Sequence, residues 1–209
     1  MKIIDDVYML DCTSGSHCYV IRGNETVLID TCFPGKGPAI LAEMAALGVK
    51  LQEIKHILLT HYDVDHIGNA AFLQQATGAT VWASAIDIPY IYGQKPRPGI
   101  KRYIGMFMKA KLPVDIRAFP ESNHLGEIEV IPTPGHTPGH VCLLYKSVLF
   151  AGDLVTIHDG QIKPSPDLMT WDKTAALDSV KKIVPFSFDW ICPAHGMPVK
   201  RGTLLEKYI

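Results

Sequence analysis

The sequence predicts an α/β fold, in which short strands alternate with helices. Runs of β-branched and aliphatic residues of strand length recur along the chain, and segments with helical spacing of apolar residues separate them. Histidine and aspartate residues follow several of these runs in short turns rich in glycine and proline. Binding sites of α/β sheets commonly form where strands end, so the same pattern indicates where a functional site lies.

The first half of the chain alternates expected strands with expected helices. Gly23-Asn24-Glu25 is suited to a hairpin turn between the second and third strands. Gly48 is a typical stop after the first helix. The expected strands are Val7–Leu10, His17–Arg22, Thr26–Asp30, Lys55–Thr60 and Ala79–Ala83, and the expected helices are Pro38–Leu47 and Gly68–Thr77.

The second half continues in the same way, with an amphipathic helix before the last strand. The expected strands are Ile128–Pro132, Val141–Tyr145, Val148–Ala151 and Asp189–Cys192, and the expected helix is Trp171–Val184. Because 209 residues fit one domain of ordinary size, we expect a single domain over residues 1–209.

Composition narrows the class of protein. A hydrophobic share of 47% with 20% charged residues is ordinary for a globular chain, and the net charge of −1 predicts no nucleic-acid partner. The first residues include acidic side chains where a signal peptide needs an apolar run, so we expect no signal peptide. The sequence contains no apolar stretch long enough to span a membrane, so we expect no membrane span. The 5 cysteines are scattered without a close pair, which favours reduced thiols and a cytoplasmic location.

Residues 86–120 differ from the rest and are expected to form a lid or insertion. They contain seven basic residues against two acidic ones, a local balance of +5. A helix with an apolar stripe is predicted there from Ile100, Tyr103, Ile104, Phe107 and Met108. The basic face suits an anionic small-molecule substrate, or is simply a solvated surface. The stripe also suits contact with a partner subunit, which leaves a homo-oligomer open.

A cluster of potential metal ligands follows the expected strand that ends at Thr60. His61 and Asp63 lie two residues apart, so they share one face of an extended segment. Asp65 and His66 lie on the turn into the next helix and can face a second ion. Imidazole and carboxylate together suit zinc, iron or manganese. Three later turns offer further ligands, namely His136, Asp153 and His195.

This arrangement resembles the metallo-β-lactamase superfamily, whose members carry a Thr-His-x-His-x-Asp-His-x-Gly loop followed by a distant histidine, aspartate and histidine. The loop here runs from Thr60 to Gly68, and the later matches are Gly-His-Thr, Ala-Gly-Asp and Ala-His-Gly. The resemblance covers essentially the whole chain. It implies an αββα sandwich of two mixed β-sheets flanked by helices, with the metals at one edge.

The resemblance also implies a role for each ligand. It assigns His61, Asp63 and His136 to a first divalent metal ion. Asp65, His66 and His195 go to a second, with Asp153 bridging the two. Most members have histidine where this chain has Asp63. That carboxylate makes iron or manganese more competitive against zinc, the metal we otherwise expect. If Asp63 binds nothing, the site holds a single ion.

The function implied is that of a metal-dependent hydrolase, in which a metal-bound hydroxide attacks an ester, thioester or lactone-like bond. No residue stands out as the general acid, and Asp65 is the candidate proton shuttle. An iron-dependent redox protein on the same fold, with a mono-iron or di-iron centre, is the alternative that Asp63 raises. A binding module that kept the fold without catalysis is a third reading.

The remaining polar residues near strand ends have simpler explanations. Four histidines are expected to be surface or core residues, namely His17, His56, His124 and His158. His140 follows His136 by four residues, and either hydrogen-bonds the ligands or the substrate, or simply starts the next strand. Asp30 is expected to cap a turn, with bracing of the site as the alternative.

Overall fold

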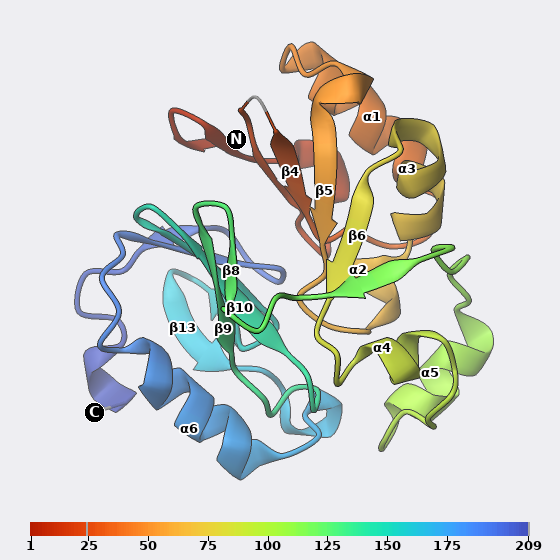
Figure 1. Cartoon of the computed structure of the whole chain (residues 1–209). Helices are drawn as coiled ribbons and strands as arrows, with labels where there is room; N and C mark the ends of the chain where they lie inside the picture. Colours follow the sequence, from red (N-terminus) through yellow and green to blue (C-terminus); the bar gives the residue numbers. More distant parts are fainter. Residues whose placement is uncertain (24, 209) are drawn as a thin grey trace.

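Two β-sheets lie face to face, with helices on their outer sides (Figure 1). The computed structural model describes residues 1–23 and 25–208, and only the backbone of residues 105–107. The helices are α1 (Gly37–Ala46), α2 (Val64–Ile67), α3 (Ala70–Thr77), α4 (Ile88–Ile91), α5 (Lys101–Phe107) and α6 (Lys173–Ile183). Short 3-10 helices are Asp11–Thr13, Leu51–Glu53, Asp167–Met169 and Glu206–Tyr208.

The first sheet follows chain order from β1 to β7. Its strands are β1 (Lys2–Ile4), β2 (Val7–Met9), β3 (Tyr19–Ile21), β4 (Thr26–Ile29), β5 (Ile54–Leu58), β6 (Thr80–Ala83) and β7 (Ile116–Ala118). Strands β1 to β4 pair antiparallel, whereas β4 to β7 pair parallel. Parallel strands need crossover connections, and α1 and α3 supply them. The carboxyl ends of β4, β5 and β6 therefore meet at one edge.

The second sheet has the order β15-β14-β11-β10-β9-β8. Its strands are β8 (His124–Leu125), β9 (Ile128–Pro132), β10 (Val141–Tyr145), β11 (Val148–Gly152), β14 (Trp190–Pro193) and β15 (Val199–Lys200). A separate hairpin joins β12 (Val155–His158) to β13 (Gln161–Pro164). Strands β11 and β14 pair parallel, so the residues that follow them lie at the same edge.

Three layers of buried apolar side chains hold these elements together. Ile40 and Leu73 pack with Leu28 between the first sheet and its helices. Tyr19 and Phe150 meet between the two sheets, with ring centroids 5.3 Å apart. The third layer lies between the second sheet and α6. Strand β11 is buried along its whole length, as expected of a strand covered on both faces.

The structure confirms the predicted α/β class and the αββα arrangement. The helix expected over Gly68–Thr77 is α3, which begins at Ala70, and the short helix α2 precedes it. A side chain at Gly68 would place its Cβ 2.3 Å from the carbonyl oxygen of Cys32, so glycine is needed for this close approach. The hairpin turn expected at 23–25 includes Asn24, which lies outside the described residues.

Residues 86–120 contain α4 and α5 and end in β7, the edge strand of the first sheet. In Figure 1 both helices lie beside α2, at the edge where β5 and β6 end. The expected apolar stripe is only partly buried, because Tyr103 is 61% exposed. The side chain of Phe107 lies outside the described part. Within residues 1–23 and 25–208, no helix has the length and apolar character needed to span a bilayer.

Candidate metal centre

The loop after β5 carries the first four of the seven ligand-type residues. His61 and Asp63 precede α2, and Asp65 and His66 lie on it. His61 and His66 are completely buried, and Asp63 is 6% exposed. The loop therefore turns its polar side chains inward, where a group without a partner is costly.

The other three residues come from turns of the second sheet at the same edge. His136 lies between β9 and β10, Asp153 directly follows β11, and His195 follows β14. The parallel pairing of β11 with β14 places Asp153 and His195 side by side. The seven predicted side chains come together in two groups, with ligand atoms within 4.8 Å of one another in each.

The first group contains His61, Asp63, His136 and Asp153. Oδ2 of Asp63 lies 3.3 Å from Nε2 of His61 and 3.0 Å from Nε2 of His136. Oδ2 of Asp153 lies 3.3 Å from Nε2 of His136 and 4.0 Å from Nε2 of His61. All of these atoms face a common point.

The second group contains Asp65, His66 and His195. Oδ2 of Asp65 lies 3.3 Å from Nε2 of His195 and 3.6 Å from Nε2 of His66. Asp153 reaches this group as well: its Oδ1 lies 3.3 Å from Nε2 of His66, and its Oδ2 lies 3.3 Å from Nε2 of His195. The two groups thus share the Asp153 carboxylate.

Several buried ligand atoms have no hydrogen-bond partner in the described protein. They include Nε2 of His61, Nε2 of His66 and Oδ1 of Asp153. Such orphaned atoms are rare in protein interiors, and each demands a reason. A divalent cation supplies that reason, because imidazole nitrogen and carboxylate oxygen are its preferred ligands. The residues present therefore fit a metal ion.

The Nδ1 atoms of His61, His66 and His195 have hydrogen-bond partners within the protein. Nδ1 of His66 donates to Oδ2 of Asp30 at 2.8 Å, and Nδ1 of His195 donates to the carbonyl oxygen of Gly15 at 2.7 Å. Nδ1 of His61 lies 3.0 Å from Oγ1 of Thr60. These contacts leave each Nε2 turned toward the cluster, as is usual for histidines that bind metal.

Two residues outside the ligand set fix the loops that carry it. Asp30 accepts from both the backbone N–H and the hydroxyl of Thr60, at 2.8 Å each, in addition to its bond from His66. The expectation that Asp30 caps a turn was wrong, and the bracing alternative holds. Asp87 accepts from Oγ1 of Thr137 at 2.7 Å and from the N–H of Gly139 at 2.8 Å, which fixes the turn after His136.

The charged side chains of the cluster shift one another's pKa values. Burial by itself would lower the pKa of His66, but the Asp30 and Asp65 carboxylates raise it well above its usual value. Burial would likewise lower the pKa of His195, but hydrogen bonds to Asp153 and Asp65 raise it to about 10. Burial would raise the pKa of Asp153, yet the imidazoles around it hold that pKa well below its usual value. Asp153 is therefore ionised, and protons on His66 and His195 balance its charge.

Three residues of the site were missed or misread by sequence reasoning. Asp87 carried no signal, since its partners lie about fifty positions away in the chain. Asp30 was expected to cap a turn, and bracing of the site was only the alternative. Lys101 was counted only as part of the basic lid, yet it is buried against Asp63. A third carboxylate in a buried cluster calls for a nearby cation, and that was the available signal for Lys101.

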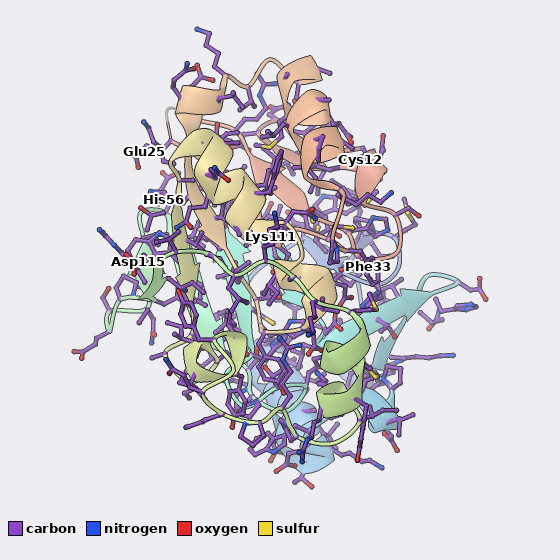
Figure 2. The ribbon with its side chains drawn as sticks, turned by 90° about the vertical axis from the view of Figure 1, so that its right-hand side faces the viewer. Cys12, Glu25, Phe33, His56, Lys111 and Asp115 are labelled. Atoms are coloured by element: carbon purple, nitrogen blue, oxygen red, sulfur yellow. The ribbon has the colours of Figure 1, made fainter. Side chains whose placement is uncertain are left out.

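The remaining histidines stay outside the ligand set. His56 accepts from Nε1 of Trp82 at 3.1 Å, and it lies near Glu25 at the edge of the fold (Figure 2). His124 and His158 are exposed, as expected. His17 is half-buried, and its backbone N–H donates to Ala194 next to His195. His140 hydrogen-bonds the ligand-bearing turn of Asp153, which decides between its two alternatives.

Comparison with known proteins agrees with this fold. The model of the metallo-beta-lactamase superfamily matches residues 13–195. The chain is 33% identical to the uncharacterized protein YobT of Bacillus subtilis over 198 residues, which are 86% of this chain and 82% of that protein. It is 29% identical to the hydroxyacylglutathione hydrolase of Rhodospirillum rubrum over 175 residues, 82% of this chain and 60% of that enzyme.

A solved structure is similar to this chain along nearly its whole length. TTHA1623 in a di-iron-bound form superposes with a TM-score of 0.73 at 27% identity, covering 92% of each chain. The chain belongs to the metallo-beta-lactamase superfamily. Family membership and the buried histidine and aspartate cluster together support a metal-dependent hydrolase.

Proposed function

We propose that the seven side chains hold two divalent metal ions, zinc in the first place, and that the chain hydrolyses an ester or thioester of a small anionic molecule. The observation that carries the proposal is the position of Asp153. Its carboxylate lies 3.3 Å from Nε2 of both His136 and His195, which belong to different ligand groups. A carboxylate shared in this way is suited to bridge two ions.

Bound metal ions would supply a Lewis acid for the acyl oxygen and a water of lowered pKa. The chain's own residues prepare the site for that chemistry. The Nδ1 contacts of His61, His66 and His195 fix their rings, so the ligands need little rearrangement. Asp65 is the least buried carboxylate of the cluster, with 15% of its side chain exposed. We propose that it moves a proton between the site and the solvent.

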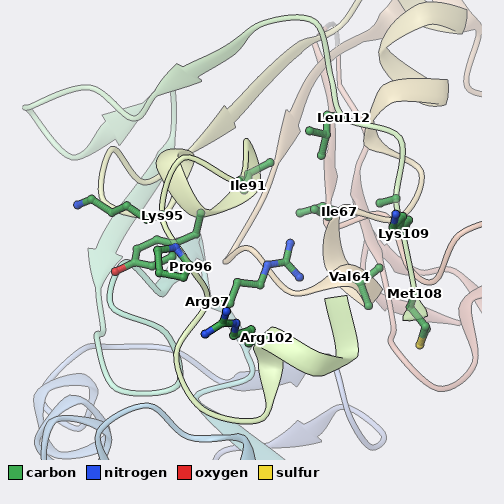
Figure 3. Close-up of a pocket in the computed structure, with 13 residues that line it drawn as sticks. Val64, Ile67, Ile91, Lys95, Pro96, Arg97, Arg102, Met108, Lys109 and Leu112 are labelled. Atoms are coloured by element: carbon green, nitrogen blue, oxygen red, sulfur yellow. The ribbon is translucent and has the colours of Figure 1, made fainter. Parts of the chain in front are cut away.

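A cavity beside the centre supports an anionic substrate (Figure 3). It has a volume of about 370 Å³ and includes Val64 and Ile67 of the α2 segment in its lining. Figure 3 shows apolar side chains and basic side chains facing the same space. Its basic residues are Lys95, Arg97, Arg102 and Lys109. An apolar body with an anionic end would match this lining.

Arg97 connects this cavity to the metal centre. It also lines a small recess together with Asp63, Asp65 and Lys101. Its guanidinium lies 5.2 Å from the ring centroid of Tyr62, a cation–π contact that orients it. A guanidinium so placed would bind a substrate carboxylate while the scissile carbonyl lies over the ligand groups. The relative named as a hydroxyacylglutathione hydrolase supports a thioester that carries carboxylates.

The test is hydrolysis of a substrate panel by protein loaded with zinc, manganese or iron. The panel pairs carboxylated thioesters, esters and lactones with neutral counterparts of the same length. We expect two metal ions per chain and turnover of the carboxylated thioesters or esters. Arg97→Gln should raise KM for the carboxylated member of each pair and leave the neutral member unchanged. Protein that binds no divalent metal, or that binds it without any hydrolysis, would exclude the proposal.

An iron-dependent redox protein is the second candidate, favoured by Asp63 and by the di-iron-bound form of TTHA1623. Carboxylate is a harder ligand than imidazole and shifts preference toward iron. Metal analysis of protein purified without added metal separates the two functions. Stoichiometric iron together with turnover of oxygen or a persulfide would establish the redox function in place of hydrolysis.

A further inference from the structure

Lys101 differs from the other basic residues of the lid because it is buried. Only 4% of it is exposed, whereas Arg102, Lys109 and Lys111 are exposed. It is the first residue of α5, and its Nζ donates to Oδ2 of Asp63 at 2.5 Å. The same Nζ donates to the carbonyl oxygen of His136 at 3.2 Å. One lid side chain thus contacts two of the ligand-bearing loops.

The Lys101 ammonium contacts the first ligand group through Asp63. Among the described residues it forms an ion pair within 4.0 Å with Asp63 and with neither Asp65 nor Asp153. Its Nζ also lies 5.5 Å from the ring centroid of Tyr62. The imidazoles of His61 and His136 approach Asp63 as well. The ammonium and the two imidazoles therefore meet at the same oxygen of Asp63, Oδ2.

The formal charges of the site explain why an ammonium beside Asp63 is useful. In the common family pattern two dications and two carboxylates leave a formal charge of +2. Asp63 adds a third carboxylate and lowers that charge to +1. The ammonium of Lys101 brings the total back to +2. The pair of Asp63 and Lys101 thus carries the same net charge as one neutral histidine, although it presents an oxygen to the metal.

We propose that Lys101 is a positioning residue of the first ligand group: by neutralising Asp63 it lowers the cation affinity of that group, and it fastens α5 over the group. The inference rests on the proposed function, since it requires the cluster to bind metal. A cation and the ammonium both neutralise Asp63, so each weakens the other's binding. Lys101 therefore lowers the affinity of the first group for its ion.

The experiment titrates zinc against a competing chelator in a His195→Ala background, which leaves the first group complete. Lys101→Met should tighten zinc binding at least tenfold, or about 1.4 kcal/mol. Lys101→Arg keeps the charge and should stay near the parent value. Lys111→Met removes an exposed lysine from the same lid segment (Figure 2) and should change the affinity less than twofold.

The partner substitution provides a second readout that a purely structural lysine would not move. Asp63→His leaves the ammonium without its carboxylate, so amide exchange of residues 100–104 should become faster. In the Asp63→His background, Lys101→Met should change zinc affinity less than threefold. Zinc affinity unaltered by Lys101→Met, or tightened equally in both backgrounds, would overturn the inference. A parent protein that binds no zinc would instead defeat the proposed function.

Discussion

The backbone N–H of Asp153 donates to Nε2 of His140 at 3.1 Å. Nε2 must then be the acceptor, so the proton of His140 is on Nδ1, which lies 2.9 Å from Oγ1 of Thr133. Burial and the nearby His136 lower the pKa of His140 to about 3, which keeps the ring neutral. His140 thus holds the turn that presents the shared carboxylate without binding a metal itself.

Replacing His140 by alanine should weaken metal binding. The change leaves the N–H of Asp153 without its acceptor and frees the Asp153 turn. Losses of such outer contacts typically cost about 10- to 100-fold in metal affinity, and we expect a loss in that range. Chelator competition measures it. His158→Ala removes an exposed histidine and should leave affinity unchanged, and equal affinities for the two variants would contradict the role of His140.

Replacing Asp30 by asparagine should loosen the second ligand group. The carboxylate accepts from Nδ1 of His66 and from Thr60, and an amide cannot accept all of these bonds. We expect about 10- to 100-fold weaker metal binding and a lower melting temperature. Asp5→Asn is the matched control, because Asp5 is fully exposed at its side chain. A stable Asp30→Asn protein with normal metal content would refute this prediction.

Asp87 should make the protein less stable as pH rises. Burial raises the pKa of Asp87 from its ordinary value of 3.8 to about 6, so between these pH values the folded state holds a proton that the unfolded state has lost. The Asp87 contribution to the free energy of unfolding therefore falls as pH rises from about 4 to about 6, by up to about 3 kcal/mol.

Urea unfolding of the parent and Asp87→Asn proteins at several pH values measures the effect. The difference in free energy of unfolding, parent minus variant, should decrease between pH 4 and pH 7. A difference that stays constant or grows over that range would show that burial does not control this carboxyl group.

Metal binding should release protons and strengthen with pH. The pKa of His195 is about 10, and that of His66 is also raised, so both are protonated at pH 7 and must lose a proton to bind metal. We expect the logarithm of the apparent zinc association constant to rise by about one to two per pH unit near neutrality. Calorimetry in buffers of different ionisation enthalpy counts the protons. A His195→Ala variant should show a smaller slope, and zinc affinity independent of pH between 6 and 8 would rule the exchange out.

Metal removal should destabilise the fold, because the cation binds the folded chain alone. Zinc at one hundred times its dissociation constant should add about 2.7 kcal/mol to the free energy of unfolding. Thermal unfolding with increasing zinc, and again after chelation, checks this. A melting temperature that does not depend on zinc would contradict metal binding at the cluster.

The ligand residues could be predicted from the sequence because their signal is local. His61 to His66 carry their spacing within one loop, and His136, Asp153 and His195 each follow a recognisable strand. The contacts that tune them could not be predicted in this way. Asp87 meets Thr137 across 50 positions, and Lys101 meets Asp63 across 38. Such pairs depend on how loops pack in three dimensions, which short-range patterns do not encode.

The residue at which a helix begins could not be predicted from the sequence for a similar reason. The periodicity of residues 68–77 predicts a helix from Gly68, whereas α3 begins at Ala70, and the backbone of Cys32 and Pro34 lies too close to Gly68 for a side chain there. The exposed fraction of Tyr103 likewise depends on which face of α5 meets the rest of the protein.

The second ligand group joins residues that lie far apart in the sequence. Nδ1 of His195 donates to the carbonyl oxygen of Gly15, a contact across 180 positions, while Asp65 and His66 come from the middle of the N-terminal half. Residues 1–195 must therefore all have left the ribosome before this group can assemble. Zinc uptake measured during synthesis should therefore not occur at this group before His195 has emerged, and it would report the docking of the two sheets.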